Sequence, residues 1–246
     1  GMNNYIQVII TYSLEENKDG EYSLPKPGEC GMITMFKRAQ QGVIKMNYDV
    51  IIIGAGPSGI FCAYELIRSN PEMKILMIEK GRAIENRNCP KRTTKKCVGC
   101  KPCSITTGFA GAGAFSDGKL SLSPDVGGNL PEILGYDRTI ELLNEADKIY
   151  LEFGADERVY GLEDYEAIER IRTKAIRANL KLIECPIRHL GTEEGYKIYT
   201  RLQNHLIASG VEIQFMTMVQ DIIIEDCRAK GVVTDKGETY YAEEIV

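Results

Sequence analysis

The sequence predicts an α/β protein built around a parallel β-sheet. Residues 48–53 (YDVIII) and 74–81 (KILMIEKG) are nearly continuous apolar runs, as expected of strands buried on both faces of a sheet. Residues 57–69 (PSGIFCAYELIRS) lie between these runs and repeat apolar residues at helical spacing. Strand, helix and strand form a β-α-β unit of about thirty residues. The expected buried face of the helix consists of Ile60, Ala63, Tyr64 and Ile67.

The rest of the chain adds helices and then short strands. Residues 121–135 carry Pro and Gly pairs, which predict irregular structure. Three helical segments follow, and the closely spaced strands near the end of the chain predict a β-meander that returns to the sheet. The predicted helices cover residues 136–154, 162–180 and 192–210, a strand covers 181–187, and the last four strands begin at 211, 219, 229 and 239.

The composition excludes several classes of protein. With 43% hydrophobic and 26% charged side chains, the 246 residues resemble an ordinary globular protein. The net charge of −5 argues against a general nucleic-acid binder, which is usually basic. No apolar run approaches the ~18–20 residues of a membrane span, and the N-terminus lacks the pattern of a signal peptide. We therefore expect a cytoplasmic protein with reduced thiols and no membrane partner.

The turn between the first strand and its helix, residues 54–59, reads GAGPSG and matches G-x-G-x-x-G. The turn follows a predicted buried strand and opens a predicted helix, which is the context that the dinucleotide-binding motif requires. Gly54 permits the tight turn, Gly56 lets a pyrophosphate approach the backbone, and Gly59 lets the helix pack close to the strand. The helix N-terminus offers free N–H groups and partial positive charge to the phosphates. These features predict a Rossmann-like FAD/NAD(P)-binding domain.

An acidic residue, Glu79, ends the second strand twenty residues after the glycine turn. Its carboxylate can accept hydrogen bonds from ribose hydroxyls, and it would repel the 2′-phosphate of NADP. A simple NAD dehydrogenase would continue with alternating strands and helices. Here a glycine-rich loop, a helical insertion and a β-meander follow, an order that resembles the two-part FAD domain of flavoproteins similar to glutathione reductase.

A second glycine-rich loop, residues 108–120 (GFAGAGAFSDGKL), suits a flat or charged ligand because its backbone is open. Together with residues 49–59 (DVIIIGAGPSG), 78–81 (IEKG) and 188–192 (RHLGT), it resembles the uncharacterised FAD-dependent dehydrogenases of bacteria. These form a branch of the glutathione-reductase-like flavoproteins and carry a cysteine-rich segment before this loop. The resemblance covers about residues 47–246, and family members are considerably longer.

The resemblance implies an FAD-dependent oxidoreductase of unspecified substrate and electron donor. The 54–59 turn would hold the FAD pyrophosphate, Glu79 the adenosine ribose, and the backbone of Val219 would contact adenine. The chain ends in what resembles the strand returning to the nucleotide domain, so whether it retains FAD stays open. The implied cofactor-binding residues are Gly54, Gly56, Pro57, Ser58, Gly59, Glu79, Lys80, Gly113, Ser116, Asp117, Gly118, Lys119, Leu120 and Val219.

The predicted organisation has three parts. Residues 2–46 form a leader of unclear role without a recognisable motif. Residues 47–123 and 205–246 form the two-part FAD-binding domain, and residues 124–204 form an inserted substrate-side region of mixed, mainly helical structure.

Four cysteines lie within fifteen residues just before the second glycine loop. The C-x2-C-x2-C triple, with one more cysteine at a distance, is a spacing that iron–sulfur sites use. Zinc sites more often have two separated pairs. Three readings stay open: a bound cluster or zinc ion, a redox-active thiol pair, and reduced thiols in a flexible basic loop. The candidate metal ligands are Cys89, Cys97, Cys100 and Cys103.

Two function hypotheses follow, with a weak candidate for a catalytic residue. His189 could act as an acid or base near neutral pH, although a lone histidine is more often a structural hydrogen-bonder. The first hypothesis is the FAD-dependent oxidoreductase. The alternative is a metal-stabilised nucleotide-binding module, a sensor or tRNA-directed protein, with zinc in the cysteine loop. A third reading is an inactive fragment of the longer enzyme.

Overall fold

The computed structural model describes residues 47–246 and two short antiparallel strands of the leader, β1 (Glu15–Glu16) and β2 (Tyr22–Ser23). The other expectations for residues 2–46 lie outside the described residues. The described chain divides into two compact units. Residues 47–80 and Ile207–Val246 belong to unit 1, and Gly81–Leu206 form unit 2.

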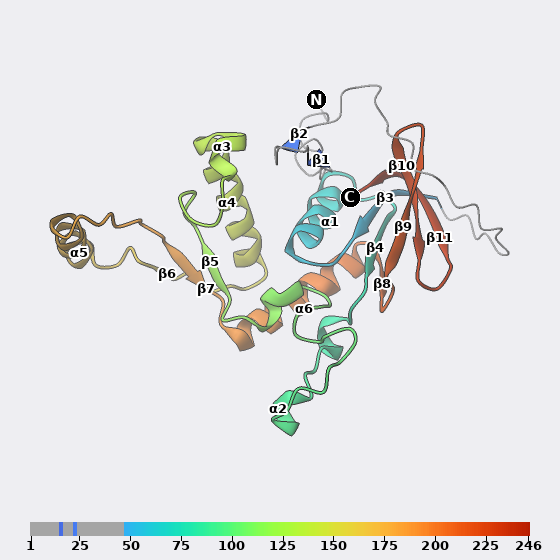
Figure 1. Cartoon of the computed structure of the whole chain (residues 1–246), viewed down its shortest axis with the longest axis horizontal. Helices are drawn as coiled ribbons and strands as arrows, with labels where there is room; N and C mark the ends of the chain where they lie inside the picture. The colour runs from blue at the N-terminus through green and yellow to red at the C-terminus, as the bar shows by residue number, and fades with distance from the viewer. Residues whose placement is uncertain (1–14, 17–21, 24–46) are drawn as a thin grey trace. The chain divides into compact units, whose positions relative to one another are not determined.

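Unit 1 contains a six-stranded mixed sheet in the order β8-β4-β3-β11-β10-β9 (Figure 1). The strands β8, β4, β3 and β11 are parallel to one another, and β10 pairs antiparallel with both β11 and β9. This is the predicted α/β fold, with a Rossmann-like β-α-β unit and a β-meander. The elements are β3 (Asn47–Ile53), α1 (Pro57–Ser69), β4 (Ile75–Glu79), β8 (Glu212–Phe215), β9 (Val219–Glu225), β10 (Arg228–Thr234) and β11 (Thr239–Ile245).

The β-α-β unit forms where the apolar runs predict it, since burial of both sheet faces selects continuous apolar strands. All five residues of β4 are buried. Cys62 packs in the core, and burial raises the pKa of its thiol to about 11. The buried residues of α1 include the four that the helical spacing predicts, Ile60, Ala63, Tyr64 and Ile67.

The strands near the end of the chain form the predicted meander with one difference. β9, β10 and β11 are successive antiparallel partners, and β11 returns to pair in parallel with β3. β8, predicted as part of the meander, instead pairs in parallel with β4. Parallel neighbours need a long crossover connection, which unit 2 supplies between these two strands.

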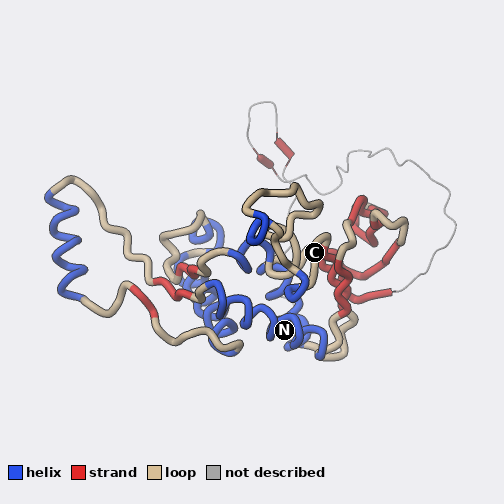
Figure 2. The backbone as a smooth tube through the Cα atoms, turned by 90° about the horizontal axis from the view of Figure 1, so that it is seen from below, coloured by secondary structure: helices blue, strands red, loops and turns tan. Residues whose placement is uncertain are grey.

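Unit 2 contains three longer helices and a small three-stranded antiparallel sheet in the order β5-β7-β6 (Figure 2). The three predicted helices are present, and Gly154, with φ +92°, follows the end of α4. The elements are η2 (Ile84–Asn86), α2 (Lys91–Thr94), η3 (Gly111–Phe115), β5 (Lys119–Ser121), α3 (Leu130–Leu134), α4 (Tyr136–Glu152), β6 (Val159–Tyr160), α5 (Tyr165–Arg177), β7 (Ile187–His189) and α6 (Thr192–Ala208).

Two expectations for unit 2 were wrong. Residues 181–186 are not a strand, and β7 begins only at Ile187. Pro186 has no N–H to donate to a ladder, and it only accepts a bond from Leu122 N, at 2.9 Å. The region 121–135, predicted to be irregular, contains the short helix α3. None of the helices in the described part of the chain is long and apolar enough to cross a membrane.

A buried ion pair holds β7 against α4. Arg188 is 4% exposed, and its Nε and Nη2 donate to the two carboxylate oxygens of Asp147 at 2.5 and 2.7 Å. A third bond runs from Arg188 to the carbonyl of Asp156. The hydrogen bond to Asp147 is the main reason that the pKa of Arg188 is raised. The guanidinium is therefore fully engaged as part of the core of unit 2.

Candidate functional site

The glycine turn between β3 and α1 has the geometry of a dinucleotide cradle. Gly54 adopts φ +106°, a conformation that side chains rarely allow. A Cβ at Gly59 would lie 2.1 Å from the carbonyl oxygen of Gly54, so this glycine is required for the helix to approach the strand. A Cβ at Gly56 would meet no atom within 4 Å, so the backbone faces open space there. Each glycine therefore has the structural property that its predicted role needs.

The N-terminus of α1 adjoins this open space. Gly56 is the N-cap and provides no side chain to cap the helix, and Pro57 follows at N1. The N–H groups of Ser58 and Gly59 lie in the first turn, where no intrahelical acceptor exists for them. The helix dipole adds partial positive charge at this end. The turn can therefore bind an anionic group such as a pyrophosphate.

Glu79 lies against the same turn. Its side chain is 6% exposed, and its Oε2 accepts a hydrogen bond from the backbone N–H of Ala55 at 2.8 Å. The carbonyl of Glu79 accepts a bond from Thr217 N at 3.1 Å, which ties the end of β4 to the segment after β8. Lys80, the next residue, is exposed. The carboxylate is thus held at the turn by the backbone of Ala55.

Val219 lies in the same unit at the start of β9. It is half-buried, pairs with Thr234 and packs against the core cluster of the sheet. Val219 therefore lies at the beginning of the meander.

The second glycine loop lies in unit 2 and contacts the RHLGT segment. β5 pairs with β7, so that Lys119 faces His189 across the ladder. Leu190 N donates to the carbonyl of Gly118 at 2.7 Å, and a Cβ on Gly118 would approach that of Leu190 to 2.9 Å. Two motifs separated by about seventy residues in the sequence thus form one structural element.

Three of the predicted flavin-side residues of this loop, Ser116, Asp117 and Lys119, are exposed. Ser116 Oγ donates to the carbonyl of Gly113 and accepts from Gly118 N, both at 3.0 Å, which fixes the turn before β5. Asp117 and Lys119 form an exposed ion pair at 2.9 Å, and the Lys119 ammonium lowers the pKa of Asp117. Gly113 and Gly118 are half-buried, as is Leu120 in β5.

Arg87, which sequence reasoning missed, organises the loop from within. It is 4% exposed and donates to four carbonyl oxygens: Ser104 at 3.0 Å, and Ile105, Phe109 and Gly111 each at 2.6 Å. Its guanidinium also lies 4.7 Å from the centre of the Phe115 ring. Arg92 of the cysteine segment lies 5.2 Å from the same ring. One buried cation therefore joins the cysteine segment to the glycine loop.

The four clustered cysteines do not form the predicted metal site. Cys97 and Cys103 are exposed, and Cys89 and Cys100 are half-buried. In the described chain, no group of three or more His, Cys, Asp or Glu side chains is arranged to hold a metal ion. The sequence spacing suggested a cluster, but the loop that carries these residues does not bring the four thiols together. The iron–sulfur and zinc hypotheses therefore have no structural support.

Cys103 has the environment of a stabilised thiolate. The pKa of its thiol is lowered chiefly by the backbone N–H of Thr106, then by the N–H of Ile105 and the hydroxyl of Thr106. Arg87 adds a smaller attraction for the negative charge. Because the thiolate is the nucleophile, a lowered pKa extends the reactivity of an exposed cysteine towards lower pH.

We therefore expect the rate of Cys103 alkylation by iodoacetamide to reach half of its maximum at a lower pH in the folded chain than in urea. Peptide mass spectrometry across a pH series measures this midpoint. Thr106→Val should shift the midpoint upwards, since it removes one hydroxyl donor. Equal midpoints in folded and unfolded chains would contradict the prediction.

His189 remains a weak catalytic candidate. Its side chain is exposed at the end of β7, and its ring makes an edge contact with Tyr160 at 6.3 Å between centroids. Lys119 faces it across the ladder. The neighbouring Arg188 lies in the buried ion pair with Asp147.

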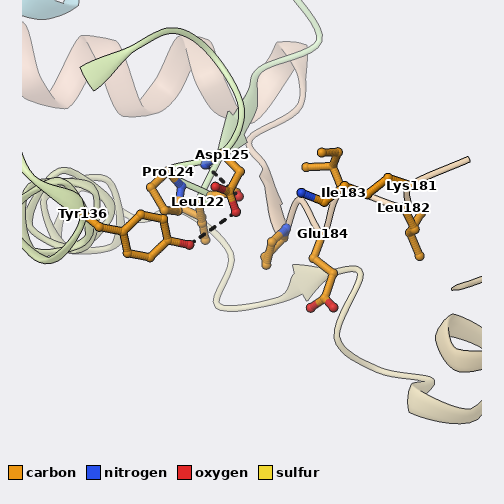
Figure 3. Close-up of a pocket in the computed structure, with 10 residues that line it drawn as sticks. Leu122, Pro124, Asp125, Tyr136, Lys181, Leu182, Ile183 and Glu184 are labelled. Atoms are coloured by element: carbon orange, nitrogen blue, oxygen red, sulfur yellow. Dashed lines mark hydrogen bonds between the residues drawn. The ribbon is translucent and has the colours of Figure 1, made fainter. Parts of the chain in front are cut away.

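Unit 2 also contains an open pocket of about 340 Å³ (Figure 3). It lies between the loop after β5 and the segment that leads to β7. The hydroxyl of Tyr136 donates to Asp125 at 3.3 Å along one side, and burial and this carboxylate together raise the pKa of Tyr136. Leu122, Pro124 and Ile183 supply apolar surface. None of the cofactor-binding, metal-binding or catalytic residues predicted from the sequence lines this pocket.

Comparison with known proteins gives a matching family model and a related sequence. The model of the Thi4 family matches residues 33–85, which include β3, α1 and β4. A thiamine thiazole synthase from Coprinopsis cinerea is 32% identical over 90 residues, which cover 33% of this chain and 26% of that protein.

Several solved structures share parts of the fold. The 3-ketosteroid-Δ4-(5α)-dehydrogenase of Rhodococcus jostii aligns with a TM-score of 0.49 and 16% identity, over 81% of this chain and 45% of that chain. Glycine oxidase from Geobacillus kaustophilus aligns with a TM-score of 0.47 and 15% identity, over 81% and 54%. L-amino acid deaminase from Proteus vulgaris aligns with a TM-score of 0.45 and 13% identity, over 86% and 49%. The chain spans about half the length of these solved proteins.

Proposed function

We propose that this chain is the dinucleotide-binding part of an FAD-dependent oxidoreductase. The observation that carries the proposal is the open space at Gly56, bounded by the N-terminus of α1 and by the buried carboxylate of Glu79. A turn that binds no ligand would not require an uncovered backbone at Gly56.

In this proposal the residues of unit 1 hold the adenosine half of FAD. The N–H groups of Ser58 and Gly59 would bind the pyrophosphate, and Glu79 would accept bonds from the ribose hydroxyls. The backbone near Val219 would contact adenine. Bound FAD would supply the redox chemistry, accepting a hydride or electrons from the substrate.

The loop in unit 2 would serve the flavin end of the cofactor. Ser116, Gly118 and Lys119 lie on an accessible turn whose shape is fixed by internal hydrogen bonds. Because Arg87 holds the preceding carbonyls, the loop is preorganised before any ligand arrives. Preorganisation lowers the entropy that binding would otherwise lose.

We further propose kinship with the uncharacterised FAD-dependent dehydrogenases of bacteria. Its support is that the glycine loop and the RHLGT segment, which carry the resemblance, pair directly through β5 and β7. The thiamine thiazole synthase match covers only 90 residues and so does not assign the reaction. The zinc-stabilised module is not favoured by any feature of the cysteine segment.

Titration of the purified full chain with FAD tests the proposal. We expect flavin fluorescence to be quenched at a stoichiometry of one FAD per chain, with weaker binding of NADP because Glu79 repels a 2′-phosphate. FAD and NAD should be compared under the same conditions. Binding of NAD without binding of FAD would overturn the flavin assignment, and binding of neither would overturn the dinucleotide site.

A further inference from the structure

The helix α5 presents an apolar surface that the described part of unit 2 leaves uncovered. In Figures 1 and 2, α5 stands at the end of an arm that begins at β6 and returns to β7. None of the residues of α5 is buried. Contiguous exposed apolar surface on a folded chain usually marks an interaction site. The exposed large apolar residues of the arm are Tyr160, Leu162, Tyr165, Ile171, Ile176, Leu180 and Ile183.

One stripe of α5 has the spacing of a helix–helix seam. Ile168, Ile171, Ala175 and Ala178 follow one another at intervals of three, four and three residues, the spacing of core positions in paired helices. The first two side chains are large and the last two are small. A partner helix that runs in the opposite direction with the same sequence would therefore place isoleucine against alanine at every layer.

The charged side chains along the arm are also segregated, with acidic residues in its first half and basic residues in its second. Residues 163–169 contain four acidic side chains, and residues 170–181 contain five basic ones. An antiparallel copy would bring the acidic half of one helix alongside the basic half of the other. In the described structure, Arg172 bridges Glu169 and Glu184 of its own chain. No ion pair among the described residues engages Glu166, Arg170, Lys174 or Arg177.

We propose that α5 pairs antiparallel with the α5 of a second copy of this chain. The two-fold axis passes near Thr173, so that Ile168 packs against the partner's Ala178 and Ile171 against the partner's Ala175. Such an interface is self-complementary, as two-fold dimers require. It is independent of the FAD proposal, since none of these residues belongs to the dinucleotide site.

Charge balance favours a second copy over a membrane surface as the occupant. Residues 163–184 contain five acidic and five basic side chains, so the arm has no net charge to attract anionic lipid. A helix of thirteen residues buries little area, and the interface is therefore expected to be weak, with a dissociation constant in roughly the micromolar range. Lys174 lies opposite the partner's Arg172 next to the axis, so Lys174→Gln should tighten the dimer.

Sedimentation velocity of the full chain across a concentration series is the first test. We expect a reversible monomer–dimer equilibrium, and Ile171→Glu should raise the dimer dissociation constant at least ~30-fold because it buries a charge in the seam. Ile133→Glu is the matched control, since Ile133 is an exposed isoleucine of α3, outside the arm. It should leave the equilibrium unchanged, and circular dichroism should be the same for all three proteins.

Two charge-reversal variants test the direction of pairing. One carries Glu163→Lys, Glu166→Lys and Glu169→Lys, so its arm is mainly basic. The other carries Glu at Arg170, Lys174 and Arg177, so its arm is mainly acidic. We expect each variant alone to be monomeric and an equimolar mixture to form a heterodimer.

A strictly monomeric wild-type chain at ~100 μM would overturn the proposal. A dimer that Ile171→Glu does not weaken would overturn it too, since the contact would then lie elsewhere. Cosedimentation of the wild-type chain with vesicles of phosphatidylserine, lost in Ile171→Glu, would assign the surface to membranes and equally refute self-pairing.

Discussion

Gly56→Val is expected to weaken binding of FAD by at least ~100-fold, about 2.7 kcal/mol, while leaving the fold intact. A side chain at this position enters the open space where the pyrophosphate would approach the backbone. Gly56 has φ −75° and ψ 177°, which valine adopts without strain, and a Cβ there contacts nothing. The free energy of unfolding should therefore change by less than about 1 kcal/mol. Fluorescence titration and urea unfolding measure the two quantities.

Gly59→Ala provides the contrast within the same turn. Its Cβ would lie 2.1 Å from the carbonyl oxygen of Gly54, so β3 and α1 would have to separate. Overpacking of this kind costs about 1–3 kcal/mol of stability. If Gly56→Val lowered stability as much as Gly59→Ala does, its effect on binding could not be assigned to a blocked cradle. If Gly56→Val bound FAD normally, the ligand would lie elsewhere.

Arg188→Met is expected to destabilise unit 2 by about 3–5 kcal/mol. The substitution leaves the carboxylate of Asp147, which is only 13% exposed, without its partner, and it also removes the donor to the carbonyl of Asp156. Urea unfolding followed by circular dichroism measures the loss. The double variant Arg188→Met with Asp147→Leu should recover part of it, because no unpaired carboxylate remains.

The matched control for this pair is Arg158, which bonds Glu163 through Nε and Nη2 at 2.7 and 3.0 Å. The geometry resembles that of Arg188, but both side chains are more than half exposed. Surface pairs of this kind contribute about 0–1 kcal/mol. Arg158→Met should therefore have little effect, and a similar loss for Arg158→Met and Arg188→Met would refute the assignment to burial.

The nucleotide unit could be predicted from the sequence because its determinants are local. The apolar runs specify β3 and β4, the glycines specify the turn, and the twenty-residue spacing places Glu79 beside it. The direction of β8 could not be predicted, since it depends on a crossover of more than a hundred residues. A short apolar run alone does not distinguish a parallel partner from a strand of a meander.

The polar residues that organise unit 2 were harder to recognise. Arg87 binds four backbone carbonyls. Because every residue has a backbone carbonyl, the sequence does not show which ones a buried arginine will bind. Arg188 and His189 are adjacent in the sequence, but strand alternation sends one into the core and the other to the surface. For the cysteines, the spacing alone suggested metal, whereas their exposure depends on how the whole segment folds.

The anchoring of Arg87 has a consequence for how the sequence can diverge. Its carbonyl partners all lie within residues 104–111, so residues 90–102 form an excursion whose two ends are tied to the same guanidinium. Insertions and deletions inside the excursion leave the anchor unchanged, while a single-residue deletion between residues 105 and 109 would shift the carbonyls of Phe109 and Gly111 relative to those of Ser104 and Ile105. The excursion is thus a natural place for grafted peptides.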